Sequence, residues 1–96
     1  MPLAYADINS HGLIGGNVIE GSVDIQTQSD RSVVTINDKQ AIVEWEKAGS
    51  AQGISIDHVM DSDATILHRV IGNETSVFNG DISGAGTIFF INPNGI

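Results

Sequence analysis

Residues 66–96 have the sequence ILHRVIGNETSVFNGDISGAGTIFFINPNGI, and this stretch decides the fold class. Its apolar runs are short, and Gly72, Gly80 and Gly86 separate them. Asn92-Pro93-Asn94-Gly95 follows the last run with strong turn-forming residues. Short apolar runs bounded by such residues are typical of β-strands. The stretch therefore predicts strands joined by tight turns.

Alternation of apolar and polar residues extends this pattern toward the amino terminus. A period of two, which places every second side chain on one face, is expected of a half-buried strand. Within 41–45, for example, Ala41, Val43 and Trp45 share a face. A short helix over 42–48 is the alternative interpretation, and we expect the strand. The segments with alternation or short β-branched runs are 18–27, 33–36, 41–45 and 54–59.

The spacing of these segments leaves three all-β architectures open. Strands that begin about every 8–12 residues suggest a sandwich, a barrel or a solenoid of stacked rungs. Residues 87–91, TIFFI, are apolar on both faces. This predicts a strand buried on both sides, which is commoner where rungs stack into a continuous core. The solenoid is therefore favoured.

Length, charge and composition exclude several classes of function. Ninety-six residues without cysteine form one domain, which no disulfide can stabilise. The formal net charge of −8 opposes binding to nucleic acid or to anionic lipid. No apolar run approaches the roughly 20 residues that span a bilayer, so we expect no membrane insertion. The basic residues are Arg31, Lys39, Lys47 and Arg69.

No pattern of residues indicates catalysis, a metal or a cofactor. The histidines lack zinc-site spacing, and the acidic run 61–63 lacks the glycine and the final glutamate of a calcium loop. There is no Gly-x-Ser-x-Gly motif, and Gly84-Ala85-Gly86 precedes a strand, so it is not a nucleotide-binding loop. We expect a protein that is not an enzyme and has no metal site and no cofactor.

A set of motifs resembles a known family. His68-Arg69-Val70 is followed by Ser76 and glycines, and a hydrophobic strand then ends in Asn92-Pro93-Asn94-Gly95-Ile96. This order resembles the amino-terminal secretion domain of the filamentous haemagglutinin family, the exoproteins of bacterial two-partner secretion. The Gly-Gly opening at 15–25 and the segment 38–45 resemble the same domain, so the likeness covers residues 13–96.

The chain departs from the family pattern at three places. His68 stands where the family usually has asparagine, and the phenylalanine that usually follows the tryptophan is absent after Trp45. The family domain also continues for at least as long again beyond the position of Ile96. The resemblance therefore implies that 13–96 corresponds to the amino-terminal part of the domain. Residues 1–12 are expected to be an irregular lead-in or a short edge strand.

The resemblance implies a fold, a partner and a location. The fold would be a right-handed parallel β-helix, a β-solenoid, with some antiparallel strands. The chain would be a non-enzymatic part of an adhesin, secreted or held at the cell surface after passing through the periplasm. An outer-membrane transporter of the Omp85-like kind would recognise it, and the domain would nucleate β-helix folding. The alternative is a structural subunit that forms a homo-oligomeric filament by stacking solenoids end to end.

The residues that the resemblance assigns to recognition and secretion are Asn92, Pro93, Asn94, Gly95, Arg69 and Val70. A physical argument supports the first four as a tight turn. Pro93 fixes one backbone angle, and Asn94 and Gly95 tolerate left-handed conformations. For Arg69, the composition predicts an ion pair with a local carboxylate, since the chain is strongly acidic.

Overall fold

The computed structural model describes residues 8–95, and these residues form strands and loops without a helix. None of them therefore belongs to a helix long and apolar enough to cross a membrane. Residues 1–7 of the expected lead-in, and Ile96, lie outside the described residues. The strands are β1 (Ile8–Ser10), β2 (Leu13–Glu20), β3 (Val23–Thr27), β4 (Arg31–Ile36), β5 (Gln40–Trp45), β6 (Ser55–Val59), β7 (Thr65–Val70), β8 (Ile82–Ser83) and β9 (Thr87–Ile91).

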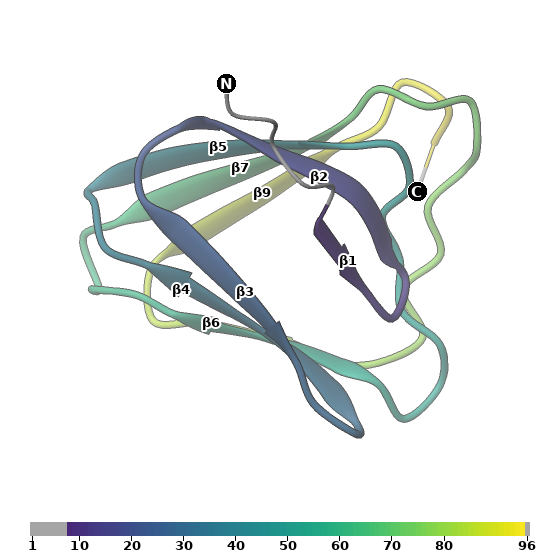
Figure 1. The fold of residues 1–96 in the computed structure, drawn as a ribbon, viewed down its shortest axis with the longest axis horizontal. Coiled ribbons are helices and arrows are strands. Elements are labelled where there is room, and N and C mark those ends of the chain that lie inside the picture. The colour runs from purple at the N-terminus through teal and green to yellow at the C-terminus, as the bar shows by residue number, and fades with distance from the viewer. Residues whose placement is uncertain (1–7, 96) are drawn as a thin grey trace, which may run out of the picture.

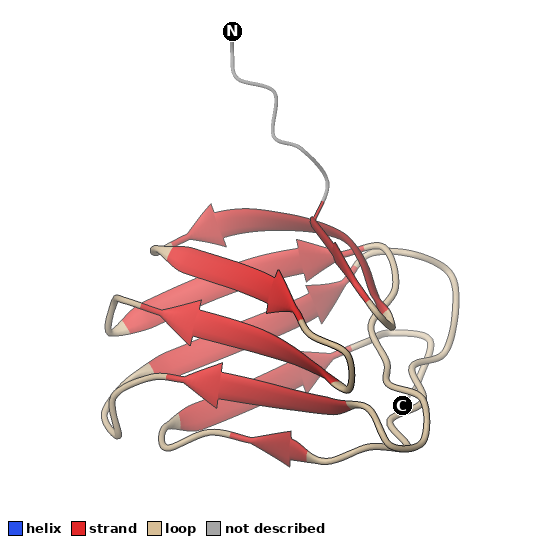
Figure 2. Ribbon diagram, turned by 60° about the horizontal axis from the view of Figure 1, so that its bottom comes forward, coloured by secondary structure: helices blue, strands red, loops and turns tan. Residues whose placement is uncertain are grey.

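The strands form two mixed sheets that face each other (Figures 1 and 2). One sheet has the order β1-β2-β5-β7-β9 and the other β3-β4-β6-β8. From β4 onward the chain crosses between the sheets at every strand, so that β4, β6 and β8 pair in parallel, as do β5, β7 and β9. The strands β1, β2 and β3 pair antiparallel with their neighbours at one edge. The all-β prediction is thus confirmed, with successive strand pairs stacked as coils.

Every second side chain of the central strands enters the core between the sheets. The prediction that Ala41, Val43 and Trp45 share a face is confirmed, because all three are buried on β5, and the helical alternative is wrong. Parallel register places His68 of β7 beside Val43 of β5. The remaining large core side chains are Leu13, Val34, Ile36, Ile56, Ile66 and Val70.

The prediction that residues 87–91 are buried on both faces is wrong. Ile88 and Phe90 are partly buried and pack against the core, but Phe89 and Ile91 are 52% and 48% exposed. No layer of the described residues covers the outer face of this sheet, so an apolar side chain there remains in contact with solvent. Apolar residues on both faces of a strand are therefore not sufficient evidence of burial.

Two glycines allow the loops at one end of the coils to stack backbone against backbone. A Cβ at Gly72, after β7, would lie 2.0 Å from the carbonyl oxygen of Glu46 in the loop after β5. A Cβ at Gly80 would lie 1.7 Å from the carbonyl oxygen of Ile54. Only glycine permits such a close approach of two backbones. The loops at this end therefore form a second region of close packing, outside the core.

We expect Ile66→Ala to lower the free energy of unfolding by about 2–5 kcal/mol, because it removes a fully buried side chain and leaves a cavity. The matched control is Leu67→Ala, since Leu67 is the next residue of β7 and lies on the outer face. Urea unfolding of both variants measures the difference. Equal losses would contradict the assignment of the core to the space between the sheets.

Candidate functional site

The residues Asn92–Gly95 form a tight turn directly after β9. The backbone N–H of Gly95 donates to the carbonyl oxygen of Asn92 at 3.0 Å, and that of Asn94 donates to the Asn92 side-chain oxygen at 2.9 Å. Asparagine first, proline second and glycine fourth are the preferences of a type I turn. Gly95 adopts a positive φ of 103°, whereas Asn94 does not. The predicted turn is present. Of the two residues expected to tolerate a left-handed conformation, only Gly95 has a positive φ.

The side chains of the two asparagines fix this turn to the loop that follows β7. The side-chain amide of Asn92 donates to the carbonyl oxygen of Glu74 at 2.8 Å and to the hydroxyl of Ser76 at 2.9 Å. The side-chain amide of Asn94 donates to the carbonyl oxygen of Gly72 at 2.7 Å. Both amides therefore bind the preceding coil, that of Asn92 from a partly buried position and that of Asn94 at the surface.

The same loop donates hydrogen bonds back to the turn. The hydroxyl of Thr75 donates to the carbonyl oxygen of Asn94, and the backbone N–H of Ser76 donates to that of Gly95, both at 3.0 Å. Pro93 lies on the exposed side. The polar groups of the turn are thus largely hydrogen-bonded within the chain, and the surface that a partner could meet consists of the exposed residues Pro93, Asn94 and Gly95.

The other two predicted residues lie at the end of the neighbouring strand. The guanidinium of Arg69 donates to Glu44 of β5 at 2.7 Å, so the predicted ion pair is confirmed. Val70 is buried in the core. Arg69 is the register partner of Ile91, the residue directly before the turn. The structure therefore gathers all six predicted residues at the ends of β7 and β9.

Arg69 belongs to a wider pattern, in which each of the four basic side chains pairs with a carboxylate of a neighbouring coil. Such exposed pairs contribute about 0–1 kcal/mol each. Within residues 8–95 they leave no basic side chain without an acidic partner. The pairs are Arg31 with Asp57, Lys39 with Asp63, Lys47 with Glu74 and Arg69 with Glu44.

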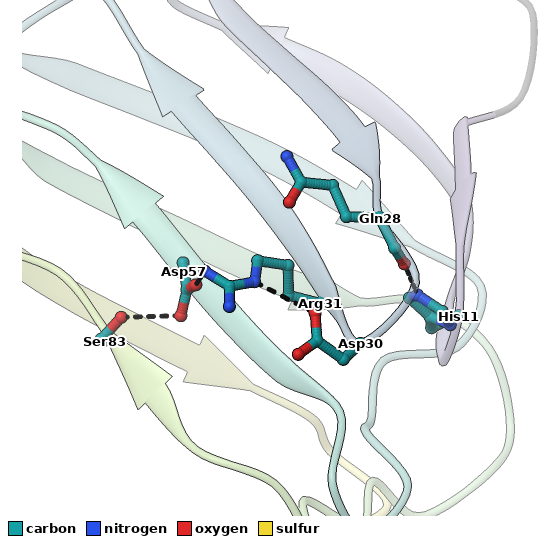
Figure 3. A network of polar contacts seen from close by, with 6 residues as sticks. All are labelled: His11, Gln28, Asp30, Arg31, Asp57 and Ser83. Carbon is teal, nitrogen blue, oxygen red and sulfur yellow. Dashed lines mark hydrogen bonds and ion pairs between the residues drawn. The ribbon is translucent and has the colours of Figure 1, made fainter.

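Figure 3 shows one of these pairs within a polar ladder across β4, β6 and β8. The guanidinium of Arg31 lies 3.2 Å from Asp30 and 3.2 Å from Asp57. The hydroxyl of Ser83 donates to the second carboxylate oxygen of Asp57 at 2.9 Å. The ladder connects three successive strands on the outer face of their sheet.

Two histidines meet in the core, which the sequence did not predict. The indole N–H of Trp45 donates to Nδ1 of His68 at 3.0 Å, and Nε2 of His68 lies 2.9 Å from Nε2 of His58. Nδ1 of His58 lies 2.9 Å from the carbonyl oxygen of Ser83. A sequence signal existed, because the alternation in β6 and β7 places both histidines on the buried face.

Stacking and burial keep both imidazoles neutral. The ring of His68 stacks on that of Phe90 with centroids 4.5 Å apart. Burial lowers the pKa of His58 below its ordinary value. Burial, together with the neighbouring His58, lowers the pKa of His68 to about 3. Residues 8–95 contain no group of three or more histidine or acidic side chains placed to hold a metal ion.

The outer face of the β5-β7-β9 sheet carries a row of apolar side chains. Register places Ile42, Leu67 and Phe89 side by side on successive strands. They line a shallow groove of about 420 Å³ together with Ile91 at its edge. The groove lies on the same sheet as Arg69, one row of residues away.

Comparison with solved structures reveals a chain of similar fold. No protein-family model matches the chain, and no curated protein matches it. Among solved structures, the chain is similar to the HMW1 secretion domain from Haemophilus influenzae, with a TM-score of 0.79 and 24% sequence identity over 86% of this chain. The two chains share a fold. The chain spans 22% of the length of the HMW1 chain. The resemblance to a secretion domain that the motifs predicted is confirmed at the level of the fold.

We expect Asn92→Ala to lower the free energy of unfolding by about 1–3 kcal/mol, because it removes the amide that satisfies buried Ser76 and the oxygen that orders the turn. Asn73→Ala is the control, since Asn73 is exposed in the facing loop, and it should change stability by no more than about 0.5 kcal/mol. Urea unfolding measures both. An Asn92 variant as stable as the control would show that the turn does not anchor this loop.

Proposed function

We propose that the chain is a non-enzymatic secretion domain of a bacterial two-partner-secreted exoprotein of the adhesin or haemagglutinin type. The observation that carries the proposal is the fold shared with the HMW1 secretion domain over 86% of the chain. The residues that the resemblance assigns to recognition add independent support, because they lie together at the ends of β7 and β9.

The coiled strands are proposed to be the beginning of a right-handed parallel β-helix that nucleates folding. Parallel pairing of β4 with β6 and of β5 with β7 supports this, because each coil presents its backbone groups to the next. Crossover connections between parallel strands are right-handed in nearly all proteins. A coil that is already formed lowers the cost of adding another, since neighbouring repeats supply most of the contacts in a solenoid.

The proposed partner is an outer-membrane transporter of the Omp85-like kind, met in the periplasm on the way to the medium or the cell surface. The surface offered to it is the end that holds the turn 92–95 and Arg69. The asparagine amides act by holding the turn in place. Pro93 and Arg69 are exposed and provide direct contacts.

A second candidate is self-assembly of the chain into a filament. The observation that favours it is β9, which carries no charged residue and exposes Phe89 and Ile91. An uncharged apolar edge strand is a ready site for pairing with another chain. Electron microscopy of concentrated protein separates the candidates, because uniform monomers argue against the filament and leave the secretion domain unaffected.

We expect Arg69→Ala and Asn92→Ala each to weaken binding to the periplasmic domains of the cognate transporter by about tenfold, which corresponds to about 1.4 kcal/mol. The first removes an exposed contact, and the second releases the turn. Calorimetry with the purified transporter domains measures binding, and the fraction of chain released into the medium measures export.

The matched controls are Lys39→Ala, which removes an ion pair in the turn between β4 and β5, at the opposite end of the coils, and Asn73→Ala in the facing loop. Both should bind and be exported as the parent chain is. Unchanged binding and export of the Arg69 and Asn92 variants would refute this recognition surface. Absence of any binding by the parent chain would refute the secretion-domain proposal itself.

A further inference from the structure

The hydrogen-bond chain through His58 and His68 permits only one arrangement of protons. The indole N–H of Trp45 can only donate, so Nδ1 of His68 is an acceptor and its proton is on Nε2. Nε2 of His68 therefore donates to His58, whose proton is on Nδ1 and is donated to the carbonyl oxygen of Ser83. Each of the four ring nitrogens is therefore a donor or an acceptor in a hydrogen bond. An additional proton on either ring has no acceptor.

Protonation of either imidazole breaks this chain. A second proton on His58 would place two N–H groups against each other across the 2.9 Å that separates the Nε2 atoms. A second proton on His68 would face the indole N–H of Trp45 in the same way. In both cases a buried cation would replace a satisfied hydrogen bond, which is strongly unfavourable.

The surroundings of the pair offer little compensation for a positive charge. The rings of Trp45 and Phe90 stack on His68, Phe78 packs against Phe90, and none of these three rings titrates. On the side of β8 the contact is the backbone carbonyl of Ser83. The carboxylate that acts on His58 is that of Asp57, which is already paired with Arg31 and accepts from the Ser83 hydroxyl on the outer face (Figure 3).

The segment that the pair contacts is the shortest strand among the described residues. The strand β8 has two residues, and its register with β6 consists of two pairs, Ile56 with Ile82 and Asp57 with Ser83. The bond from His58 to the carbonyl of Ser83 is one of its few further anchors. A protonated His58 could still donate from Nδ1 to Ser83, so β8 is released only when the repulsion at Nε2 drives the ring out of the core and the bond to Ser83 is lost with it.

We propose that His58 and His68 form an acid-sensitive latch, which holds β8 against β6 while both imidazoles are neutral and releases it when they are protonated. Burial lowers the pKa of both histidines in the closed structure. Once the segment opens, they return toward the ordinary value of about 6.5. The closed state is therefore fully favoured above about pH 6.5 and loses stability as the pH falls toward the lowered pKa values.

Two neighbouring backbone amides of the coil test the proposal. The N–H of Ile56 donates to the carbonyl oxygen of Asp81 and reports on the β8 side. The N–H of Ser55 donates to the backbone carbonyl oxygen of Asp30 and reports on the β4 side. Between pH 7.5 and 5.5, we expect protection of the Ile56 amide from hydrogen exchange, corrected for intrinsic rates, to fall about tenfold if one imidazole titrates and about a hundredfold if both do. Protection of the Ser55 amide should change by less than about threefold.

The matched variants are His58→Gln with His68→Gln, which cannot titrate, and His11→Gln, which replaces an exposed histidine outside the core. The double variant should lose the pH dependence at Ile56, and the His11 variant should keep it. Equal protection of the parent chain at both pH values, or the same fall in the double variant, would overturn the latch.

Nitrogen NMR of the parent chain keeps the proposal testable if the double variant does not fold. The folded protein at pH 5.5 should show two neutral imidazoles, with His58 protonated at Nδ1 and His68 at Nε2. A folded state in which either ring titrates near pH 6.5 would overturn the latch. The protein would then accept the proton while β8 stays held against β6.

Discussion

The imidazole of His68 on β7 contacts side chains from three other strands. It accepts from Trp45 on β5, donates to His58 on β6 and stacks on Phe90 of β9. A buried polar ring must satisfy both nitrogens, and it can do so only if the three strands lie in one register. The ring therefore specifies how the coils align, which an apolar side chain of the same size would not do.

Polar contacts between neighbouring coils also occur in the loops, where amides and charged side chains take the place of the imidazole. The turn after β9 is fixed to the loop after β7 by asparagine amides, and the basic side chains reach from one coil to the next. Each coil is thus connected to its neighbour in the core, at the surface and at the loops. Such redundancy suits a short chain without disulfides, because no single layer has enough buried area to hold the coils together.

The sequence was sufficient to predict what depends on local pattern. Alternation located most of the strands, and Asn92-Pro93-Asn94-Gly95 identified the turn, because both signals involve residues that are close in the chain. The exposure of Phe89 was not predictable in this way, since it depends on which face of a sheet remains uncovered. The contact of Trp45 with His68 was missed because it arises from the register of two strands that are 23 residues apart. The partner loop of the turn depends on the same register.

The stacked loops at the Gly72 and Gly80 end constrain how such a chain can diversify. Backbones that already touch leave no space for an inserted residue, so changes of chain length at this end would separate two coils. The turns at the opposite end, which hold Asp38 and Asp61 to Asp63, are exposed to solvent. Insertions and deletions among related sequences should therefore accumulate at those turns, and a peptide tag added there should leave the coils intact.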